Sequence, residues 1–173
     1  MNLIVLFAIA SLQLPPVDAF SVQCELQGLY DEASQMALAA RSAAEIDMFH
    51  VVLDTPDFVV IDTKGARHLW EEMRARAVQA LKEPRFDSLV QMIQKLSLTS
   101  QGVVVVTNVT SARKLIDEQG QYGPKGTAHT LSKTTVVRDT WVRAENGWRR
   151  KMREEISEKA LSVDGKSFKS RLN

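Results

Sequence analysis

The sequence is poor in the residues that cross-link small domains or bind metals. It has one cysteine and three histidines among 173 residues. A single cysteine excludes an internal disulfide, and three scattered histidines give none of the spacings that are typical of a zinc site. We therefore expect no metal and no cofactor.

An excess of one charge sign is also lacking. The 22 Lys and Arg residues nearly balance the 21 Asp and Glu residues, which leaves a net charge of +1. A nucleic-acid partner is therefore not expected. The most basic run, Arg149-Arg150-Lys151 with Arg153, alternates between the two faces of an expected strand and forms no single stripe. A hydrophobic content of 45% does provide for one domain with a core.

The sequence has one long apolar run, at its amino terminus. Residues 3–14 are almost wholly apolar, prolines follow at 15 and 16, and Ala19 ends a short segment of suitable cleavage residues. This pattern resembles a secretory signal peptide, residues 1–19, cleaved after Ala19. About 12 apolar residues are too few for a bilayer core that needs ~20. We expect a secreted or periplasmic protein with no stable membrane span after cleavage. The alternatives are an uncleaved anchor and a misassigned start codon, because no Lys or Arg precedes the run.

Three helices are expected in the first half of the domain. Apolar and small residues recur at three- and four-residue steps over residues 24–41, which predicts an amphipathic helix. Ser42-Ala43-Ala44-Glu45 has the form of a capping box and starts a second helix. A short strand over 58–62 precedes a third helix over 69–80.

Extended segments fill most of the remaining chain. They cover residues 89–99, 103–113, 127–144 and 147–161. Three helices followed by four long strands predict an α+β domain over residues 24–166, with a polar tail over 167–173. We expect a curved antiparallel sheet with the three helices packed on its concave side. A pocket between helices and sheet would hold a small molecule.

The Asn146-Gly147 dipeptide sets the expected register of the last two strands, because Asn-Gly is the strongest short-range hairpin signal. A two-residue turn there predicts the pairs Asp139–Glu154, Trp141–Met152, Arg143–Arg150 and Val137–Ile156. This register leaves Arg138 and Arg153 on the solvent face. The candidate ligand-binding residues on the apolar face are Trp141, Arg143, Arg150, Met152 and Glu154.

Two acids facing each other on an apolar surface allow two interpretations. Asp139 and Glu154 share one proton, because two close carboxylates resist double ionisation. Alternatively, Arg143 and Arg150 neutralise the pair or bind an anionic ligand. The two interpretations predict opposite pKa shifts, and both stay open.

Several segments resemble the nuclear transport factor 2-like superfamily. They are Leu29-Tyr30, Phe58 to Asp62 before a glycine turn, Asp139 to Val142, Asn146 to Arg149, and Val163 to Lys166. Within the superfamily, the chain is most similar to SnoaL-like and DUF4440-type domains, over roughly residues 24–166. The resemblance implies a cone-shaped α+β barrel with a pocket at its wide end. It also implies a homodimer through the outer face of the sheet.

Similarity to ketosteroid isomerases within this superfamily suggests three catalytic candidates. It places Tyr30 and Asp139 as hydrogen-bond donors to an oxyanion and Asp62 as the general base. Each residue also has a purely structural explanation. Tyr30 is then a core residue, Asp62 starts a turn, and Asp139 belongs to a salt-bridge cluster.

We therefore expect an exported protein that binds a small hydrophobic or anionic ligand, with or without turnover. The first alternative is an isomerase, cyclase or dehydratase that uses Tyr30, Asp62 and Asp139. The second is a dimeric interaction domain. The fold hosts many functions, so the question of an enzyme stays open.

Overall fold

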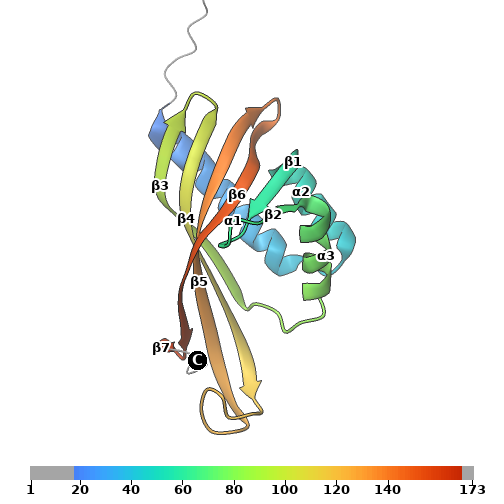
Figure 1. Cartoon of the computed structure of the whole chain (residues 1–173), viewed down its shortest axis with the longest axis vertical. Helices are drawn as coiled ribbons and strands as arrows, with labels where there is room; N and C mark the ends of the chain where they lie inside the picture. Colours follow the sequence, from blue (N-terminus) through green and yellow to red (C-terminus); the bar gives the residue numbers. More distant parts are fainter. Residues whose placement is uncertain (1–17, 169–173) are drawn as a thin grey trace, which may run out of the picture.

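The chain folds into three helices and one twisted sheet, shown by the computed structural model in Figure 1, which describes residues 18–168. The helices are α1 (Ala19–Ala39), α2 (Ala43–Leu53) and α3 (Trp70–Ala80). The strands are β1 (Asp54–Ile61), β2 (Arg67–Leu69), β3 (Ser88–Thr99), β4 (Gly102–Asp117), β5 (Thr127–Ala144), β6 (Gly147–Val163) and β7 (Lys166–Phe168). The predicted α+β class, with three helices against one curved sheet, is confirmed.

The first two helices begin where side chains satisfy their free backbone N–H groups. The carboxylate of Asp18 accepts from the N–H groups of Phe20 and Ser21 at 3.3 and 3.2 Å, so α1 starts at Ala19 and not near residue 24. The rest of the predicted signal peptide, residues 1–17, lies outside the described residues. At α2, the Ser42 hydroxyl accepts from the Glu45 N–H at 3.3 Å, which confirms the predicted cap.

The sheet has the strand order β2-β1-β6-β5-β4-β3, and β7 pairs with β6. Neighbouring strands are antiparallel except β1 and β6, which are parallel, so the sheet is mixed and not wholly antiparallel as predicted. These two strands lie far apart in the chain, and no hairpin constrains their relative direction. The pairing of β7 with β6 extends to residues 167 and 168, which the sequence assigned to the polar tail.

The predicted register of the last two strands is wrong. Gly147 pairs with Ala144, so the turn consists of Glu145 and Asn146. A two-residue Asn-Gly turn of type I′ needs a positive φ at both residues. Here Gly147 has a φ of +108° and Asn146 has no positive φ.

The difference between the predicted and the observed register continues along β5 and β6. An irregularity between Thr140 and Trp141 adds Lys151 to β6, so Asp139 pairs with Arg153 and not with Glu154. For the other three predicted pairs, the observed pairs are Trp141–Arg150, Arg143–Trp148 and Val137–Glu155.

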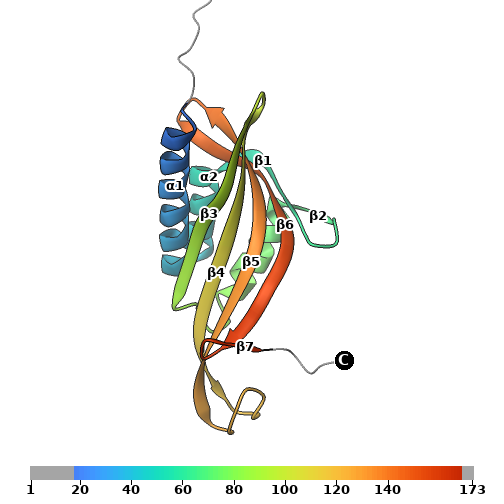
Figure 2. The same ribbon diagram turned by 90° about the vertical axis from the view of Figure 1, so that its left-hand side faces the viewer.

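The helices cover one face of the sheet, and the other face is open (Figure 2). Helix α1 packs on β3, where the Gln27 side chain donates to the Gln91 carbonyl at 2.8 Å and accepts from the Ile93 N–H at 3.1 Å. The buried core between α1 and the sheet contains Val22, Leu26, Tyr30, Val103, Val105, Trp141 and Trp148. Helices α2 and α3 lie beside β1 and β2, away from this core (Figure 1).

Candidate functional site

A cavity of about 530 Å³ lies between the helices and the inner face of the sheet. Its volume falls within the range of roughly 300–1,000 Å³ that is usual for small-molecule sites. Most of the wall is apolar and comes from all three helices, β1 and the segment that follows α3. These side chains include Met36, Ile46, Phe49, Phe58, Met73 and Ala77.

Asp54 and Arg150 form a buried ion pair in the cavity wall. They are partners in the parallel pairing of β1 with β6. The Nε and Nη2 atoms of Arg150 each lie 2.8 Å from Oδ1 of Asp54, and His50 Nδ1 lies 3.1 Å from Oδ2. The guanidinium lies 4.7 Å from the centroid of the Phe58 ring, a cation–π contact. The His50 ring stacks on Trp70 at 3.9 Å.

A second ion pair lies next to the first. Arg153 lines the cavity and donates from Nε and Nη2 to the two oxygens of Asp139, at 2.8 and 2.7 Å. Nη2 also donates to Gln91 Oε1 at 3.1 Å. Behind Arg153, the Tyr30 hydroxyl donates to Asp139 Oδ2 at 2.7 Å, and the Trp141 indole donates to the Tyr30 oxygen at 3.0 Å. Bidentate pairing and three hydrogen bonds to the carboxylate make this a rigid unit.

The protonation states of this unit are fixed at neutral pH. Burial favours the neutral form of Asp139, but the charge and hydrogen bonds of Arg153 outweigh it and lower the pKa of this carboxyl. Burial, together with the charge of Asp139, raises the pKa of Tyr30 far above its usual value. The pKa of Arg153 is also raised, because the attraction of Asp139 exceeds the effect of burial. Neutralisation of Asp139 by arginine was one of the two interpretations. Its ion-pair partner, Arg153, was not expected, while the charge of Arg150, which was, also lowers the pKa of Asp139.

The three catalytic candidates do not meet in the cavity. Tyr30 and Asp139 are in contact, but both lie behind the wall and neither lines it. Asp62 closes the turn after β1, where it accepts from the N–H groups of Lys64 and Ala66, both at 2.9 Å, and binds His68 Nε2 at 3.1 Å. The hydrogen bond from His68 lowers the pKa of Asp62. The contacts of all three residues agree with their structural explanations.

Of the five candidate ligand-binding residues, Arg150 lines the cavity and the other four do not. Trp141 is buried in the core. Arg143 is exposed and pairs with Glu25 at 3.0 Å. Met152 and Glu154 are on the outer face, because the register differs from the predicted one. Glu154 there pairs with Arg138 at 2.8 Å.

Sequence reasoning missed Asp54, Arg153 and Gln91. The wrong register placed Arg153 on the solvent face. Gln91 carried a sequence signal, because it is a polar residue at an inward position in the alternation of β3. Its side-chain amide donates there to the Tyr30 carbonyl and to Ser34 Oγ.

The side chains of the three histidines are largely buried. The side chains of His50, His68 and His129 are 12%, 12% and 10% exposed, and each ring contacts a carboxylate. The carboxylates are on Asp54, Asp62 and Asp164. His50 and Asp54 stand four residues apart, a spacing that could have pointed to their contact.

The cavity therefore offers an apolar wall with hydrogen-bond donors at one place. The guanidinium groups of Arg150 and Arg153 are the donors, since both residues line the cavity. Their charges are already balanced by Asp54 and Asp139. Within the same residues, no three His, Cys, Asp or Glu side chains are grouped to hold a metal ion. Nor does any helix in that range combine the length and apolar character needed to cross a membrane.

Several solved structures are similar to this chain in three dimensions. A hexachlorocyclohexane dehydrochlorinase, LinA type 2, has a TM-score of 0.55 at 10% identity, over 89% of this chain and 97% of its own. The Kfla4162 protein from Kribbella flavida has a TM-score of 0.54 at 14% identity, over 83% and 93%. A protein from Novosphingobium aromaticivorans assigned as a scytalone dehydratase has a TM-score of 0.53 at 13% identity, over 89% and 93%. No family model and no curated protein sequence matches the chain. Identities this low indicate a shared fold and nothing about activity.

Proposed function

We propose that this chain, which has the nuclear transport factor 2-like fold that its sequence resembles, binds a small, largely apolar molecule in the cavity between helices and sheet. The cavity itself carries the proposal, because it has a volume of about 530 Å³ and a mostly apolar wall that includes the side chains of Arg150 and Arg153. Two of the similar structures bear the names of enzymes that act on small molecules, hexachlorocyclohexane and scytalone, which supports such a ligand. The narrower SnoaL-like or DUF4440-type assignment stays a prediction.

Binding is favoured over turnover by the positions of the catalytic candidates. An isomerase of the kind suggested by the sequence needs Tyr30, Asp62 and Asp139 around one substrate. None of the three lines the cavity. The low pKa of Asp139 also opposes the protonated state in which that residue would donate to an oxyanion.

A bulky side chain inside the cavity tests this proposal. Ala77 lines the cavity from α3, whereas Gln79 on the same helix is exposed and does not. We expect Ala77→Trp to weaken the binding of the neutral fluorophore Nile red at least tenfold, and Gln79→Trp to leave it unchanged. Circular dichroism verifies that both variants fold. Equal binding by the two variants, or no binding by the wild-type chain, would contradict the proposal.

Export is part of the proposal and rests on the sequence of residues 1–19. Cleavage after Ala19 would remove Asp18, the residue that caps α1. Expression in a bacterial host with a periplasm, followed by amino-terminal sequencing, tests this step. We expect the periplasmic protein to begin at Phe20. A cytoplasmic product with an intact amino terminus would count against export.

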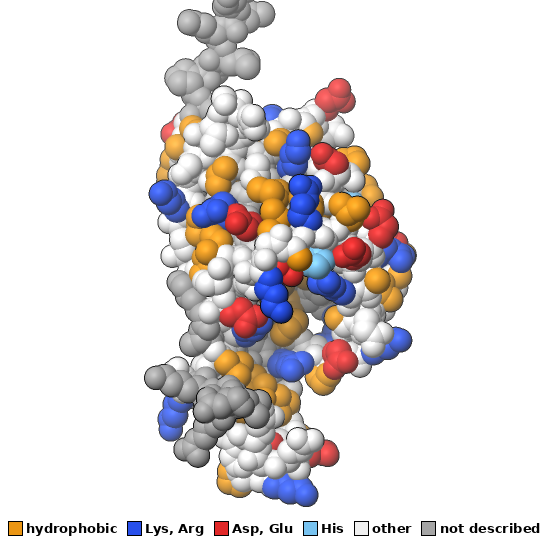
Figure 3. All heavy atoms as spheres, in the orientation of Figure 1, with side chains coloured by type: hydrophobic (Ala, Val, Ile, Leu, Met, Phe, Trp, Pro, Cys, Tyr) orange, Lys and Arg blue, Asp and Glu red, His pale blue; other side chains and the backbone are white. Residues whose placement is uncertain are grey.

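A homodimer through the open sheet face is the second candidate role. Val90 and Met92 of β3 lie on this face and are 47% and 51% exposed. Hydrophobic side chains occur among charged ones across this side of the molecule (Figure 3). We expect a dimer in sedimentation at micromolar concentration. Met92→Lys should convert it to a monomer, whereas Met48→Lys, at an exposed position on α2, should not. A monomeric wild-type chain would refute this role.

A further inference from the structure

Arg113 is a half-buried arginine whose side chain has no partner in the part of the chain that the structure describes. It lies on β4, in the two-residue alternation that turns Val103, Val105 and Thr107 into the buried inner face. The pairing of β4 with β5 continues without irregularity to Arg113, which is opposite Leu131. The side chain of Arg113 makes no hydrogen bond or ion pair with any residue of the described part of the chain.

The other arginines of the inner face all have carboxylate partners. The pairs are Arg143–Glu25, Arg150–Asp54 and Arg153–Asp139. A charge that is partly withdrawn from water without a partner costs free energy. An anion bound beside Arg113 would offset that cost.

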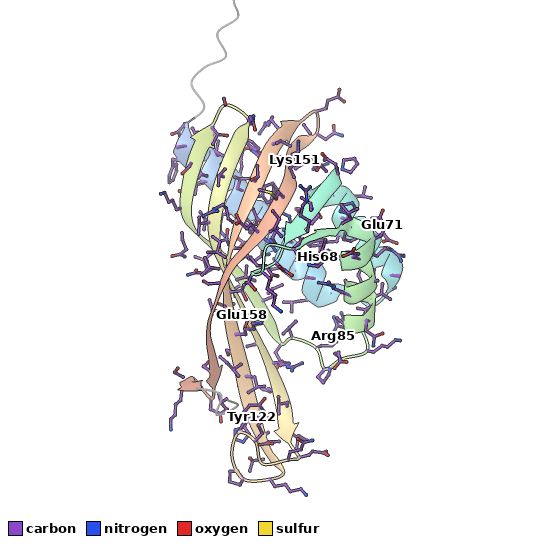
Figure 4. All side chains as sticks on the ribbon, viewed as in Figure 1. His68, Glu71, Arg85, Tyr122, Lys151 and Glu158 are labelled. Carbon is purple, nitrogen blue, oxygen red and sulfur yellow. The ribbon has the colours of Figure 1, made fainter. Side chains whose placement is uncertain are left out.

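The position of Arg113 suits a ligand that extends out of the main cavity. Arg113 and Phe86 line both the main cavity and a smaller hollow of about 210 Å³. Leu131 and Leu161 line the hollow as well, together with Lys133, whose charge is paired with Glu158. Figure 4 marks Arg85, below the helical part of the molecule, and Glu158, on β6.

The charge of the main cavity also favours an anion. Four arginines line it, namely Arg85, Arg113, Arg150 and Arg153. Two carboxylates, Asp54 and Glu83, share the wall, and Asp139 lies behind it. One positive charge therefore remains in excess, and of the two lining arginines without a carboxylate partner, Arg85 is exposed and Arg113 is half-buried.

We propose that the ligand of the cavity is an amphipathic anion whose acidic group binds to Arg113. Its apolar part lies among Met36, Phe49, Met73 and Phe86, and its head group is at the junction of the two hollows. A guanidinium presents donors in a fork that matches the oxygens of a carboxylate or a similar acid. The inference rests on the proposed binding function and specifies the class of ligand.

Two probes of equal chain length separate the head group from the apolar part. The experiment measures how well dodecanoate and dodecanol each compete with Nile red for binding to the wild-type chain, to Arg113→Gln and to Arg138→Gln. Arg138 serves as the matched control because it lies on the outer face of the same sheet. A hydrogen bond to a charged group corresponds to a difference in affinity of about tenfold to a hundredfold between dodecanoate and dodecanol. We expect the wild-type chain and Arg138→Gln to prefer dodecanoate by this factor, and Arg113→Gln to lose the preference while its affinity for dodecanol stays the same.

The outcomes distinguish this inference from the function on which it depends. In one outcome, the wild-type chain binds dodecanol, Ala77→Trp abolishes this binding, and the wild-type chain shows no preference for dodecanoate. This outcome would overturn the role of Arg113 and leave the binding function in place. A preference that persists in Arg113→Gln would place the acid elsewhere and also overturn the inference. Absence of binding by both probes would contradict the inference and the proposed function together.

Discussion

Replacement of Asp139 by Asn tests the buried ion pair that the observed register creates. Asp139 is fully buried and accepts three hydrogen bonds, two from Arg153 and one from Tyr30. The Asn side chain is the same size but carries no charge, so Arg153 remains buried without a counter-ion. Breaking a buried ion pair in this way costs about 3–5 kcal/mol.

Glu154→Gln is the matched control for this change. Glu154 pairs with Arg138 on the outer face, where the two side chains are 34% and 45% exposed. Solvent-exposed ion pairs contribute about 0–1 kcal/mol. In the register predicted from the sequence, the two acids would face each other, and their replacements would have similar effects.

Urea unfolding followed by tryptophan fluorescence measures both changes. We expect Asp139→Asn to lower the free energy of unfolding by about 3–5 kcal/mol at an unchanged m-value, and Glu154→Gln by less than about 1 kcal/mol. The double variant Asp139→Leu with Arg153→Met should recover much of the loss, because a well-packed apolar pair replaces a buried ion pair at little cost. A loss below about 1 kcal/mol for Asp139→Asn, or equal losses for the two single variants, would refute the reasoning.

Three further predictions concern acid stability, a glycine and the first helix cap. The pKa of Asp139 is lower in the folded chain than in the unfolded chain, so its stabilisation is present above the unfolded value of about 3.9 and disappears as the pH falls through the folded value. Fluorescence-monitored acid unfolding should therefore be less steep in Asp139→Asn. At Gly102, where φ is +144°, a Cβ would lie 2.1 Å from the Trp141 carbonyl oxygen, so thermal denaturation should show a far larger loss for Gly102→Ala than for Gly65→Ala, which has open space. Asp18→Ala should lower the free energy of unfolding by about 1 kcal/mol in the uncleaved chain, measured by urea titration.

The parts of the fold that depend on local patterns could be predicted from the sequence. The Ser42 cap, the helical periodicity of α1 and the alternation in β3 to β6 each reflect chemistry within a few residues. The start of α1 was placed too late because Asp18 had been assigned to a signal peptide. The parallel contact of β1 with β6 could not be predicted, since it joins segments almost a hundred residues apart and leaves no local signal.

The candidate site was predicted less well because register controls which face a side chain occupies. A shift of one residue exchanges the two faces of a strand. The extra residue in β6, Lys151, moved Arg153 inward and Glu154 outward. Arg150 remained at the wall because it precedes the irregularity. Arg113 carries no sequence signal of its own, since its significance comes from the absence of a side-chain partner within residues 18–168.

Methionine methyl NMR tests the binding cavity most directly. Met36 and Met73 line the cavity, whereas Met48 and Met92 are exposed elsewhere and Met152 is on the outer face. In a titration of the ¹³C-methyl-labelled chain with dodecanoate, we expect the Met36 and Met73 signals to shift and saturate together. The Met48, Met92 and Met152 signals should stay in place. Shifts confined to Met92 and Met152 would place the ligand on the open sheet face and contradict a cavity between helices and sheet.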